Sequence, residues 1–159
     1  MDLVVLYTAK YLVFVIVLLA GVYWLTLPKK QKIQMLIFAV ILAIVAFLLT
    51  RIGGMLYYDP RPFVSHSVAP IYPHPDNNGF PSDHTALAFV VASSVFYMSK
   101  KIGAIFLVLA LMVGVSRVIG NIHSPIDIVG SIVFVVIAYV LSKYATKYIL
   151  MKLEPKSIS

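Results

Sequence analysis

The chain has 159 residues, of which 61% are hydrophobic and only 12% are charged, and it contains no cysteine. A soluble domain usually has about 25% charged residues, so this composition excludes an ordinary water-soluble globular protein and also a disordered chain. The absence of cysteine excludes a disulfide scaffold, a thiolate nucleophile and cysteine-ligated metal centres. The net charge of +7 is more typical of lysines in the cytoplasmic loops of a membrane protein than of nucleic-acid binding.

Five hydrophobic segments follow one another along the chain. A helix that spans a bilayer needs about 20 apolar residues, so the first and last segments are comfortably long, and the third and fourth are short. The first segment exceeds the apolar run of a signal peptide, and no small-residue cleavage site follows it, so we expect a retained helix. In chain order the segments are Leu3–Leu27, Ile33–Thr50, Thr85–Ser99, Ile102–Val118 and Ile126–Ile149.

These segments predict an all-α integral membrane protein with a single domain over residues 1–159. We expect a bundle of about five transmembrane helices, with a Pro-rich outward loop between the second and third. Five spans place three groups of lysines on one side, which the positive-inside rule makes cytoplasmic. The N-terminus would then lie outside and the C-terminus in the cytoplasm, with Lys10 snorkelling outward. The groups are Lys29, Lys30 and Lys32; Lys100 and Lys101; and Lys143, Lys147, Lys152 and Lys156.

The other polar residues concentrate in two loops that this topology places outside the membrane, 51–84 and 117–126. Solvated loops normally carry lysine and glutamate, but these two loops contain neither. Arginine, histidine and aspartate together are typical of an anion site with proton chemistry, and charge beside a bilayer is usually functional. The loops hold Arg51, Arg61, Arg117, His66, His74, His84, His123, Asp59, Asp76 and Asp83, and Asp127 follows them.

The first of these loops leads into the third hydrophobic segment. Six prolines between residues 60 and 81 exclude a regular helix and stiffen the loop. Ser82 or Asp83 is a plausible N-cap for the helix that begins at Thr85. The free amides and the positive end of that helix would face outward and attract an anion. Because the Asp83 carboxylate would repel a phosphate, we expect it to hold its own helix or an arginine.

The second loop ends in a helix start. Ser124 followed by Pro125 is a strong signal for the first helical position, which places Asp127 in the first turn. A carboxylate there can accept the Nδ1–H of His123 and leave Nε2 as an oriented nucleophile. Taken alone, the pair fits a simple helix cap equally well. Arg117, six residues before His123, favours the functional interpretation.

Three stretches of these loops follow a recognisable spacing. Ser116 and Arg117 are followed after five residues by His123 and after three more by Asp127. Upstream stand Pro81-Ser82-Asp83-His84 and the pair Arg61-Pro62. These stretches resemble the active-site signature of the type 2 phosphatidic acid phosphatases, which bacterial acid phosphatases and vanadium haloperoxidases share. That signature reads Lys, six residues, Arg-Pro; then Pro-Ser-Gly-His; then Ser-Arg, five residues, His, three residues, Asp.

The sequence departs from this signature at two positions. Asp83 replaces the glycine of the second part, and Gly54 stands where the first part has lysine. Arg51 shares a helix face with Gly54 if the second helix extends to about residue 56, and would then supply the missing cation. The Asp-Pro-Arg-Pro-Phe run, the Asp-Asn-Asn-Gly-Phe run and the Ser-Asp-His variant resemble the bacitracin-resistance type of undecaprenyl pyrophosphate phosphatase. The whole resemblance covers about residues 51–130.

The resemblance implies hydrolysis of undecaprenyl pyrophosphate to undecaprenyl phosphate and inorganic phosphate at an outward-facing site. His123 would attack and become a phosphohistidine, Asp127 would orient His123, and His84 would protonate the leaving lipid phosphate and then activate water. No metal or other cofactor is implied. The partners are a polyprenyl pyrophosphate or phospholipid phosphate and membrane lipids, and not nucleic acid. His66 and His74 match no motif, so we expect loop roles for them. The substrate phosphate would be bound by Arg61, Arg117, Ser82, Asp83 and Arg51.

Other functions fit parts of the sequence. Phosphatidic acid or phosphatidylglycerophosphate is the alternative substrate within the same family. A metal-dependent hydrolase would use His66, His74, His84 and Asp83, although no two of these histidines stand four residues apart on one helix. A channel or scaffold would explain the helices but not the clustered arginines, histidines and aspartates. A vanadate-dependent peroxidase shares the signature, but five membrane spans favour a lipid substrate.

Overall fold

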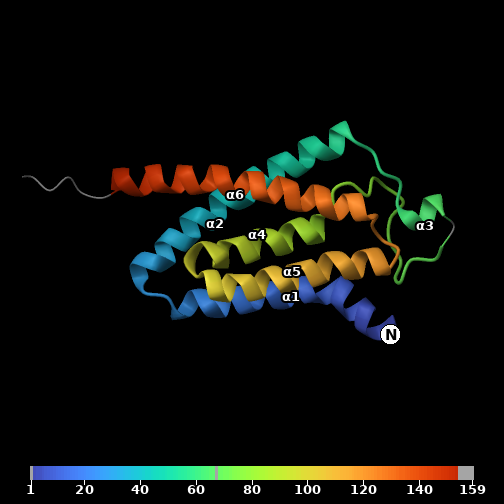
Figure 1. Cartoon of the computed structure of the whole chain (residues 1–159), viewed down its shortest axis with the longest axis horizontal. Coiled ribbons are helices and arrows are strands. Elements are labelled where there is room, and N and C mark those ends of the chain that lie inside the picture. Colours follow the sequence, from blue (N-terminus) through green and yellow to red (C-terminus); the bar gives the residue numbers. More distant parts are fainter. Residues whose placement is uncertain (1, 67, 154–159) are drawn as a thin grey trace, which may run out of the picture.

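The computed structural model describes residues 2–66 and 68–153, which are mainly helical and form no strand. Successive long helices run in alternating directions, and the connection between the second and fourth helices lies at one end of the bundle (Figure 1). The predicted all-α membrane architecture is therefore confirmed. The helices are α1 (Asp2–Thr26), α2 (Lys29–Leu56), α3 (Pro62–Ser65), α4 (Asp83–Met98), α5 (Lys100–Ile119) and α6 (Pro125–Leu153).

Within the described residues, four helices, α1, α2, α5 and α6, are long and apolar enough to cross a membrane. Helix α4 has 16 residues, or about 24 Å at 1.5 Å per residue, against a hydrocarbon core of about 30 Å. The third hydrophobic segment was correctly predicted to be short. The prediction for the fourth was wrong, because α5 continues through both lysines that precede the segment and reaches 20 residues.

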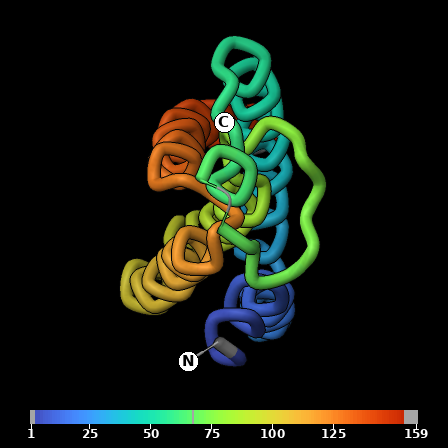
Figure 2. The backbone as a smooth tube through the Cα atoms, turned by 90° about the vertical axis from the view of Figure 1, so that its right-hand side faces the viewer, coloured from blue at the N-terminus to red at the C-terminus, as the bar shows by residue number. Residues whose placement is uncertain are grey.

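Helix α4 lies at the centre of the bundle. It packs against α1, α2, α5 and α6, whereas α1 barely touches α2 and α5 barely touches α6. Seen from the end, the other long helices surround it (Figure 2). Small side chains allow this close approach, as they do between helices in membranes. The small buried residues of α4 are Ala86, Ala88, Ala92, Ser93 and Ser94.

Side-chain caps fix where the central helices begin. The hydroxyl of Ser82 accepts a hydrogen bond from the amide of Thr85 (3.5 Å), so α4 begins at Asp83 and Ser82 is its N-cap. Ser99 separates α4 from α5 and caps the latter through the amide of Ile102 (3.4 Å). Such caps satisfy amides that the first helical turn leaves unpaired. The predicted capping role of Ser82 is confirmed.

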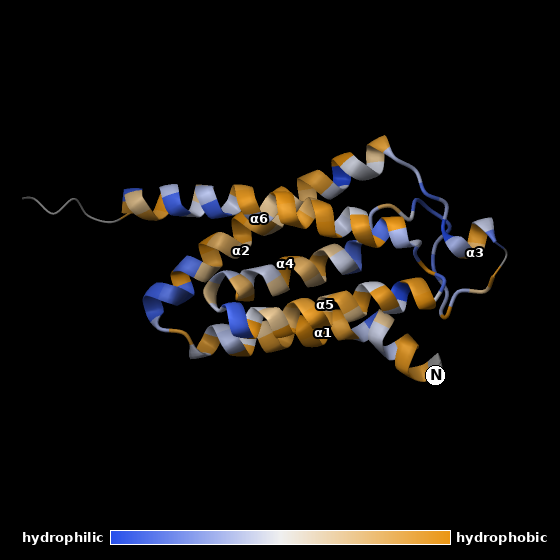
Figure 3. Cartoon of the chain, in the orientation of Figure 1, coloured by the Kyte–Doolittle hydropathy of each residue, from blue (hydrophilic) through white to orange (hydrophobic). Residues whose placement is uncertain are grey.

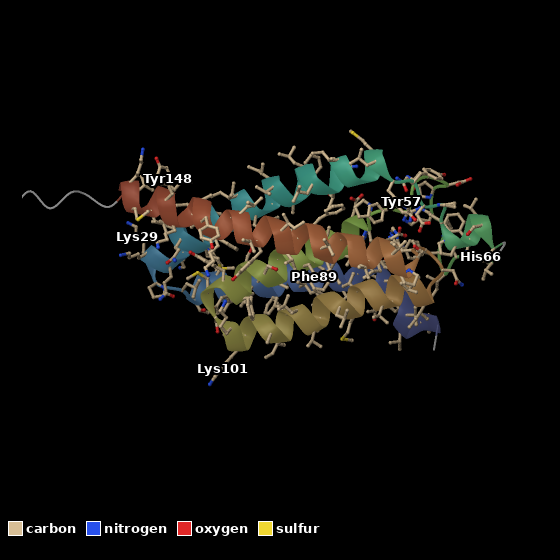
Figure 4. All side chains as sticks on the ribbon, turned by 45° about the horizontal axis from the view of Figure 1, so that its top comes forward. Lys29, Tyr57, His66, Phe89, Lys101 and Tyr148 are labelled. Atoms are coloured by element: carbon tan, nitrogen blue, oxygen red, sulfur yellow. The ribbon has the colours of Figure 1, made fainter. Side chains whose placement is uncertain are left out.

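Charge and polarity divide between the two ends of the bundle. The described N-terminal end of α1 lies at the same end as the connection between α2 and α4 (Figure 1). Figure 3 shows mainly apolar helix middles, with polar residues gathered in the connections at both ends of the bundle. Lys29 and Lys101 lie at the end opposite Tyr57 and His66 (Figure 4). The lysine groups and the histidine-rich loops are thus at opposite ends, as the topology requires; Lys156 lies outside the described residues.

Candidate active site

Two loops and the start of α4 meet at the end of the bundle opposite the three lysine groups. Asn78 joins the long loop to α2, because its Nδ2 donates to the carbonyl oxygens of Gly54 (2.9 Å) and Tyr57 (2.9 Å). Its Oδ1 accepts from the amides of Asp59 and Phe80, both at 3.0 Å. The amide of Ile71 donates to the carbonyl of Gly120 at 3.0 Å and ties the same loop to the second one. The loops are therefore fixed relative to each other.

His123 and Asp127 form a buried pair at the start of α6. Nδ1 of His123 lies 3.0 Å from Oδ2 of Asp127, and the same oxygen accepts from the backbone amide of Ser124 at 2.9 Å. The second bond is that of a capping box, in which a first-turn carboxylate reaches back to the N-cap amide. Asp127 therefore serves both as a helix cap and as the hydrogen-bond partner of His123, so the predicted contact is confirmed and the role of His123 as a nucleophile stays a prediction.

Two arginines converge on the other nitrogen of His123. Nη1 of Arg61 and Nη2 of Arg117 each lie 3.3 Å from Nε2. Because Nδ1 carries the proton donated to Asp127, Nε2 has a free lone pair that accepts from both. Arg61 is only 6% exposed and Arg117 only 1%. In residues 2–66 and 68–153, neither guanidinium forms an ion pair with a carboxylate.

Neutral oxygens hold Arg61 in place. Its Nε donates to Oδ1 of Asn77 (3.0 Å), its Nη1 to the carbonyl of Ile122 (3.0 Å), and its Nη2 to the carbonyl of Asn78 (3.4 Å). These bonds orient the guanidinium, and none of the three acceptors is a carboxylate.

Arg117 is held in a similar way by α1 and by the long loop between α3 and α4. Its Nη1 donates to the carbonyl of Ala9 in α1 (3.1 Å) and to the hydroxyl of Tyr72 (2.9 Å). Its Nη2 lies 3.4 Å from Nε2 of His74. Two buried charges of the same sign, each fixed by neutral partners, create a positive potential at Nε2 of His123 that favours a bound anion.

His74 corrects the sequence-based expectation of a loop role. Besides its contact with Arg117, its ring lies edge-on to that of His123, with the centroids 6.2 Å apart. His66 is exposed, and its Nδ1 contacts the adjacent Ser65 hydroxyl at 2.8 Å. No motif contains His74, so the only sequence signal was its position between Pro73 and Pro75, which restrict the backbone.

Sequence reasoning also missed the residues that hold the site together. Tyr72, Asn77 and Asn78 orient the two arginines or their loop, as described above. Asp59 accepts a hydrogen bond from the hydroxyl of Ser124, directly beside the His123–Asp127 pair. Their partners are 16 or more residues away in sequence, so local spacing could not reveal these roles.

The start of α4 supplies another wall of the site. Ser82 is fully buried, and its hydroxyl accepts from that of Thr85 at 3.0 Å. Its amide donates to the carbonyl of Asp127 (3.3 Å), which joins α4 to α6. Asp83 and His84 follow and line the open side, where Asp83 is exposed and His84 partly buried. Phosphate binding by Ser82 and Asp83 stays a prediction.

A cavity of about 440 Å³ brings these groups together. Its wall includes all three arginines and three of the four histidines, with His66 outside it. Of the site residues predicted from the sequence, all line the cavity except Ser82 and Asp127, which lie behind its wall. The lining residues are Thr50, Arg51, Gly54, Met55, Arg61, His74, Asn77, Asn78, Phe80, Pro81, Asp83, His84, Arg117 and His123.

Burial and the arginine charges control protonation at this cavity. Burial, followed by the charges of Arg117 and Arg61, lowers the pKa of His123 from 6.5 to about 2. Burial, followed by the charge of Arg61, also lowers the pKa of His74. Burial and Arg117 lower the pKa of Arg61 as well, although a guanidinium keeps its proton in proteins. Nε2 of His123 is therefore unprotonated near neutral pH and available as a nucleophile.

The metal-dependent alternative required His66, His74, His84 and Asp83 to act together. Within the described ranges, no three or more histidine, aspartate or glutamate residues form a group that could hold a metal ion. That alternative therefore lacks a ligand set in this part of the chain.

Comparisons with known proteins find several relatives of this chain. The chain is 40% identical over 126 residues to the bacitracin transport permease protein BcrC of Bacillus licheniformis, covering 79% of this chain and 62% of that protein. It is 29% identical to the undecaprenyl-diphosphatase BcrC of Bacillus subtilis strain 168, covering 86% and 70%. The putative undecaprenyl-diphosphatase YbjG of Escherichia coli K12 is 31% identical, covering 80% and 64%. The chain thus spans less than two thirds of the first and third of these relatives.

A solved structure and a family model agree on the fold. The crystal structure of Aquifex aeolicus LpxE superposes with a TM-score of 0.68 at 22% identity, covering 90% of this chain and 85% of that one. The family model described as the PAP2 superfamily matches residues 34–151, which include all the residues predicted for the active site. This chain therefore belongs to the PAP2 superfamily.

Proposed function

We propose that this protein is a membrane lipid pyrophosphate phosphatase that hydrolyses undecaprenyl pyrophosphate to undecaprenyl phosphate and inorganic phosphate. The observation that carries the proposal is the convergence of two buried guanidiniums on Nε2 of His123, each 3.3 Å away and neither paired with a carboxylate of the described residues. The names of the relatives in Bacillus subtilis and Escherichia coli support the substrate.

The contacts of the two arginines suggest how they act. Arg61 and Arg117 both donate to the nitrogen that would attack phosphorus. A terminal phosphoryl group placed at Nε2 would take over these donors with its equatorial oxygens, which carry the charge in the transition state. Guanidiniums suit this exchange because they bind phosphate oxygens through a planar fork of donors.

The first step transfers the terminal phosphoryl group to the enzyme. The lone pair on Nε2 of His123 forms a bond to the terminal phosphorus, and the bond from that phosphorus to the bridging oxygen breaks. The bridging oxygen keeps the electron pair and leaves as lipid phosphate, and His84, which takes up a proton from solvent when the anionic substrate binds, donates that proton to it. Asp127 accepts the Nδ1–H throughout and stabilises the charge that develops on the imidazole.

The second step regenerates the enzyme. His84, now neutral, accepts a proton from water, whose oxygen attacks the phosphorus of the phosphohistidine. The bond between phosphorus and nitrogen breaks, inorganic phosphate leaves, and His123 recovers its lone pair. The two steps consume one water and return both histidines to their starting states.

We also propose that the site faces outward and that the C-terminus is cytoplasmic. The separation of the lysine groups from the histidine-rich loops supports this orientation, because lysines gather on the cytoplasmic side. A reporter fused after residue 159 should behave as cytoplasmic. An outward-facing reporter would contradict the proposed orientation without affecting the proposed chemistry.

Phosphate release from undecaprenyl pyrophosphate by the purified protein in detergent tests the function. The wild type and His66→Ala, which removes an exposed histidine outside the cavity, should both turn over. His123→Ala should fall to background. Substrate labelled in its terminal phosphate should give a protein-bound label that is labile to acid and stable to base. Release from phosphatidic acid or phosphatidylglycerophosphate with none from the pyrophosphate would favour the alternative substrates and contradict this assignment.

A further inference from the structure

Arg51 differs from the other two arginines of the cavity. It projects from the last two turns of α2 and is exposed, whereas Arg61 and Arg117 are buried. Its guanidinium carbon lies 5.0 Å from the centre of the Phe47 ring. Within the part of the chain that the structure describes, it forms no hydrogen bond or ion pair. Its donors are therefore available to a ligand.

Arg51 stands where two cavities meet. The second cavity is a groove of about 460 Å³ between α2 and α4, and its lining is mainly apolar. Thr50, Arg51 and Asp83 belong to the walls of both this groove and the polar cavity. The remaining lining residues of the groove are Ala43, Ala46, Phe47, Ala86, Leu87 and Val90.

The surroundings of Gly54 explain why the cation is Arg51, one helical turn before the position where the family signature has lysine. A Cβ atom at Gly54 would lie 3.1 Å from the carbonyl oxygen of Phe80, closer than most Cβ contacts. Asn78 also binds the carbonyl of Gly54. The loop thus occupies the space beside residue 54, and the positive charge instead lies at residue 51, on the groove side of the cavity.

A lipid diphosphate extends through both spaces. This step rests on the proposed function, which places the terminal phosphorus at Nε2 of His123 between the two buried arginines. The hydrocarbon chain needs apolar surroundings, which the groove between α2 and α4 provides. The second phosphate, linked to the lipid, must then lie at the junction. A lipid monophosphate would place an uncharged ester segment there.

We propose that Arg51 binds the lipid-linked phosphate of a diphosphate substrate and thereby selects lipid diphosphates over lipid monophosphates. The Asp83 carboxylate lies at the same junction and disfavours an anion there. Arg51 therefore offsets Asp83 as well as the charge of the second phosphate. The buried arginines bind the transferred group in either class of substrate, but Arg51 has an anionic partner only in the diphosphate.

The test compares two substrates in the same detergent micelles, undecaprenyl pyrophosphate and phosphatidic acid. Arg51→Gln should lower kcat/KM for the pyrophosphate by about 10- to 100-fold, the size expected for one charge-assisted hydrogen bond. Activity on phosphatidic acid should change by no more than about threefold. Arg51→Lys should recover part of the loss. Lys101→Gln, which removes an exposed cation at the opposite end, controls for net charge and should match the wild type.

The ratio of the activity on undecaprenyl pyrophosphate to that on phosphatidic acid tests the proposed role of Arg51. Equal losses on both substrates would mean that Arg51 binds the transferred phosphoryl group, and this would overturn the proposal. No loss on either substrate would also overturn it. If the wild type turns over neither lipid, the proposed function fails. The role of Arg51 is then tested by measuring how tightly the same two lipids bind to His123→Ala and to the double variant His123→Ala/Arg51→Gln. If the double variant loses the preference for the diphosphate, the role of Arg51 is supported. If the preference is unchanged, the role of Arg51 is overturned.

Discussion

A single carboxylate oxygen of Asp127 accepts hydrogen bonds from Nδ1 of His123 (3.0 Å) and from the backbone amide of Ser124 (2.9 Å). The first bond orients the imidazole, and the second completes the start of α6. Because one atom does both, the position of the proposed nucleophile is fixed directly to a helix end and does not depend on a mobile loop.

This shared oxygen predicts how Asp127→Asn will behave. The amide side chain can still be accommodated, but it no longer fixes Nε2 as the unprotonated nitrogen. We expect turnover of undecaprenyl pyrophosphate to fall by about 10²- to 10⁴-fold, less than in His123→Ala, where the nucleophile is absent. Weakening of the capping bond should also destabilise the protein by about 1 kcal/mol. Steady-state kinetics and thermal unfolding in detergent check both effects, and an Asp127→Asn variant as inactive as His123→Ala would contradict the ranking.

The lowered pKa of His123 predicts an acid sensitivity of the fold. The unfolded chain binds a proton at this residue below about pH 6.5, whereas the folded chain resists it until about pH 2. The contribution of His123 to stability is therefore complete above pH 6.5 and is lost progressively as the pH falls below that value. Between about pH 7 and pH 5, in a buffer free of phosphate, the Tm of the wild type should fall more steeply than that of His123→Asn. Parallel curves would show that burial does not hold this imidazole neutral.

The role of His84 is best tested with two leaving groups. His84→Ala leaves His123 and both buried arginines in place and removes only the proton transfer, which usually contributes about 10²- to 10⁴-fold. An activated aryl phosphate needs that proton least, since its leaving group is already stable as an anion. We therefore expect a much smaller loss on p-nitrophenyl phosphate than on the lipid. The same loss on both would assign His84 to phosphate binding and not to proton transfer.

Gly79 is predicted to be intolerant of any side chain. A Cβ atom there would lie 2.9 Å from Oδ2 of Asp127 and 3.1 Å from the carbonyl oxygen of Asp59. Gly79→Ala must therefore displace the carboxylate that orients His123, and we expect at least a tenfold loss of turnover, consistent with the sensitivity of catalysis to small misplacements. Gly21→Ala is the matched control, because a Cβ at that position meets nothing within 4 Å. It should retain full activity.

Charge compensation by guanidiniums predicts the response to chelators and to vanadate. Arg61 and Arg117 already occupy the positions from which a phosphoryl group would be neutralised, so activity should survive EDTA. Vanadate adopts the trigonal-bipyramidal geometry of the transferring phosphoryl group and should inhibit competitively. Because His123→Ala has no turnover to inhibit, vanadate binding is measured directly, and it should be lost in this variant. Loss of wild-type activity in EDTA, restored by a divalent metal, would refute this mechanism.

The sequence was informative where the relevant geometry is local. His123 and Asp127 lie four residues apart across a helix start, so spacing and capping rules were enough to predict their contact. The cap at Ser82 followed from the same rules. His74 was missed because its contact with Arg117 joins residues 43 positions apart, across a proline-rich loop whose path no periodic pattern specifies. The length of α5 was underestimated because lysines were treated as helix boundaries, although their flexible side chains can remain in the first turn of a membrane helix.

The bond from Arg117 to the carbonyl of Ala9 has a consequence for how such sites are recognised. Helix α1 lies outside the stretch that the family model matches, residues 34–151, yet it supplies one of the oxygens that hold the most deeply buried arginine. Every residue type offers a backbone carbonyl, so this contribution leaves no mark in the identity of residue 9. A segment can therefore vary freely in sequence and still be indispensable to an active site, provided its main chain keeps the same path.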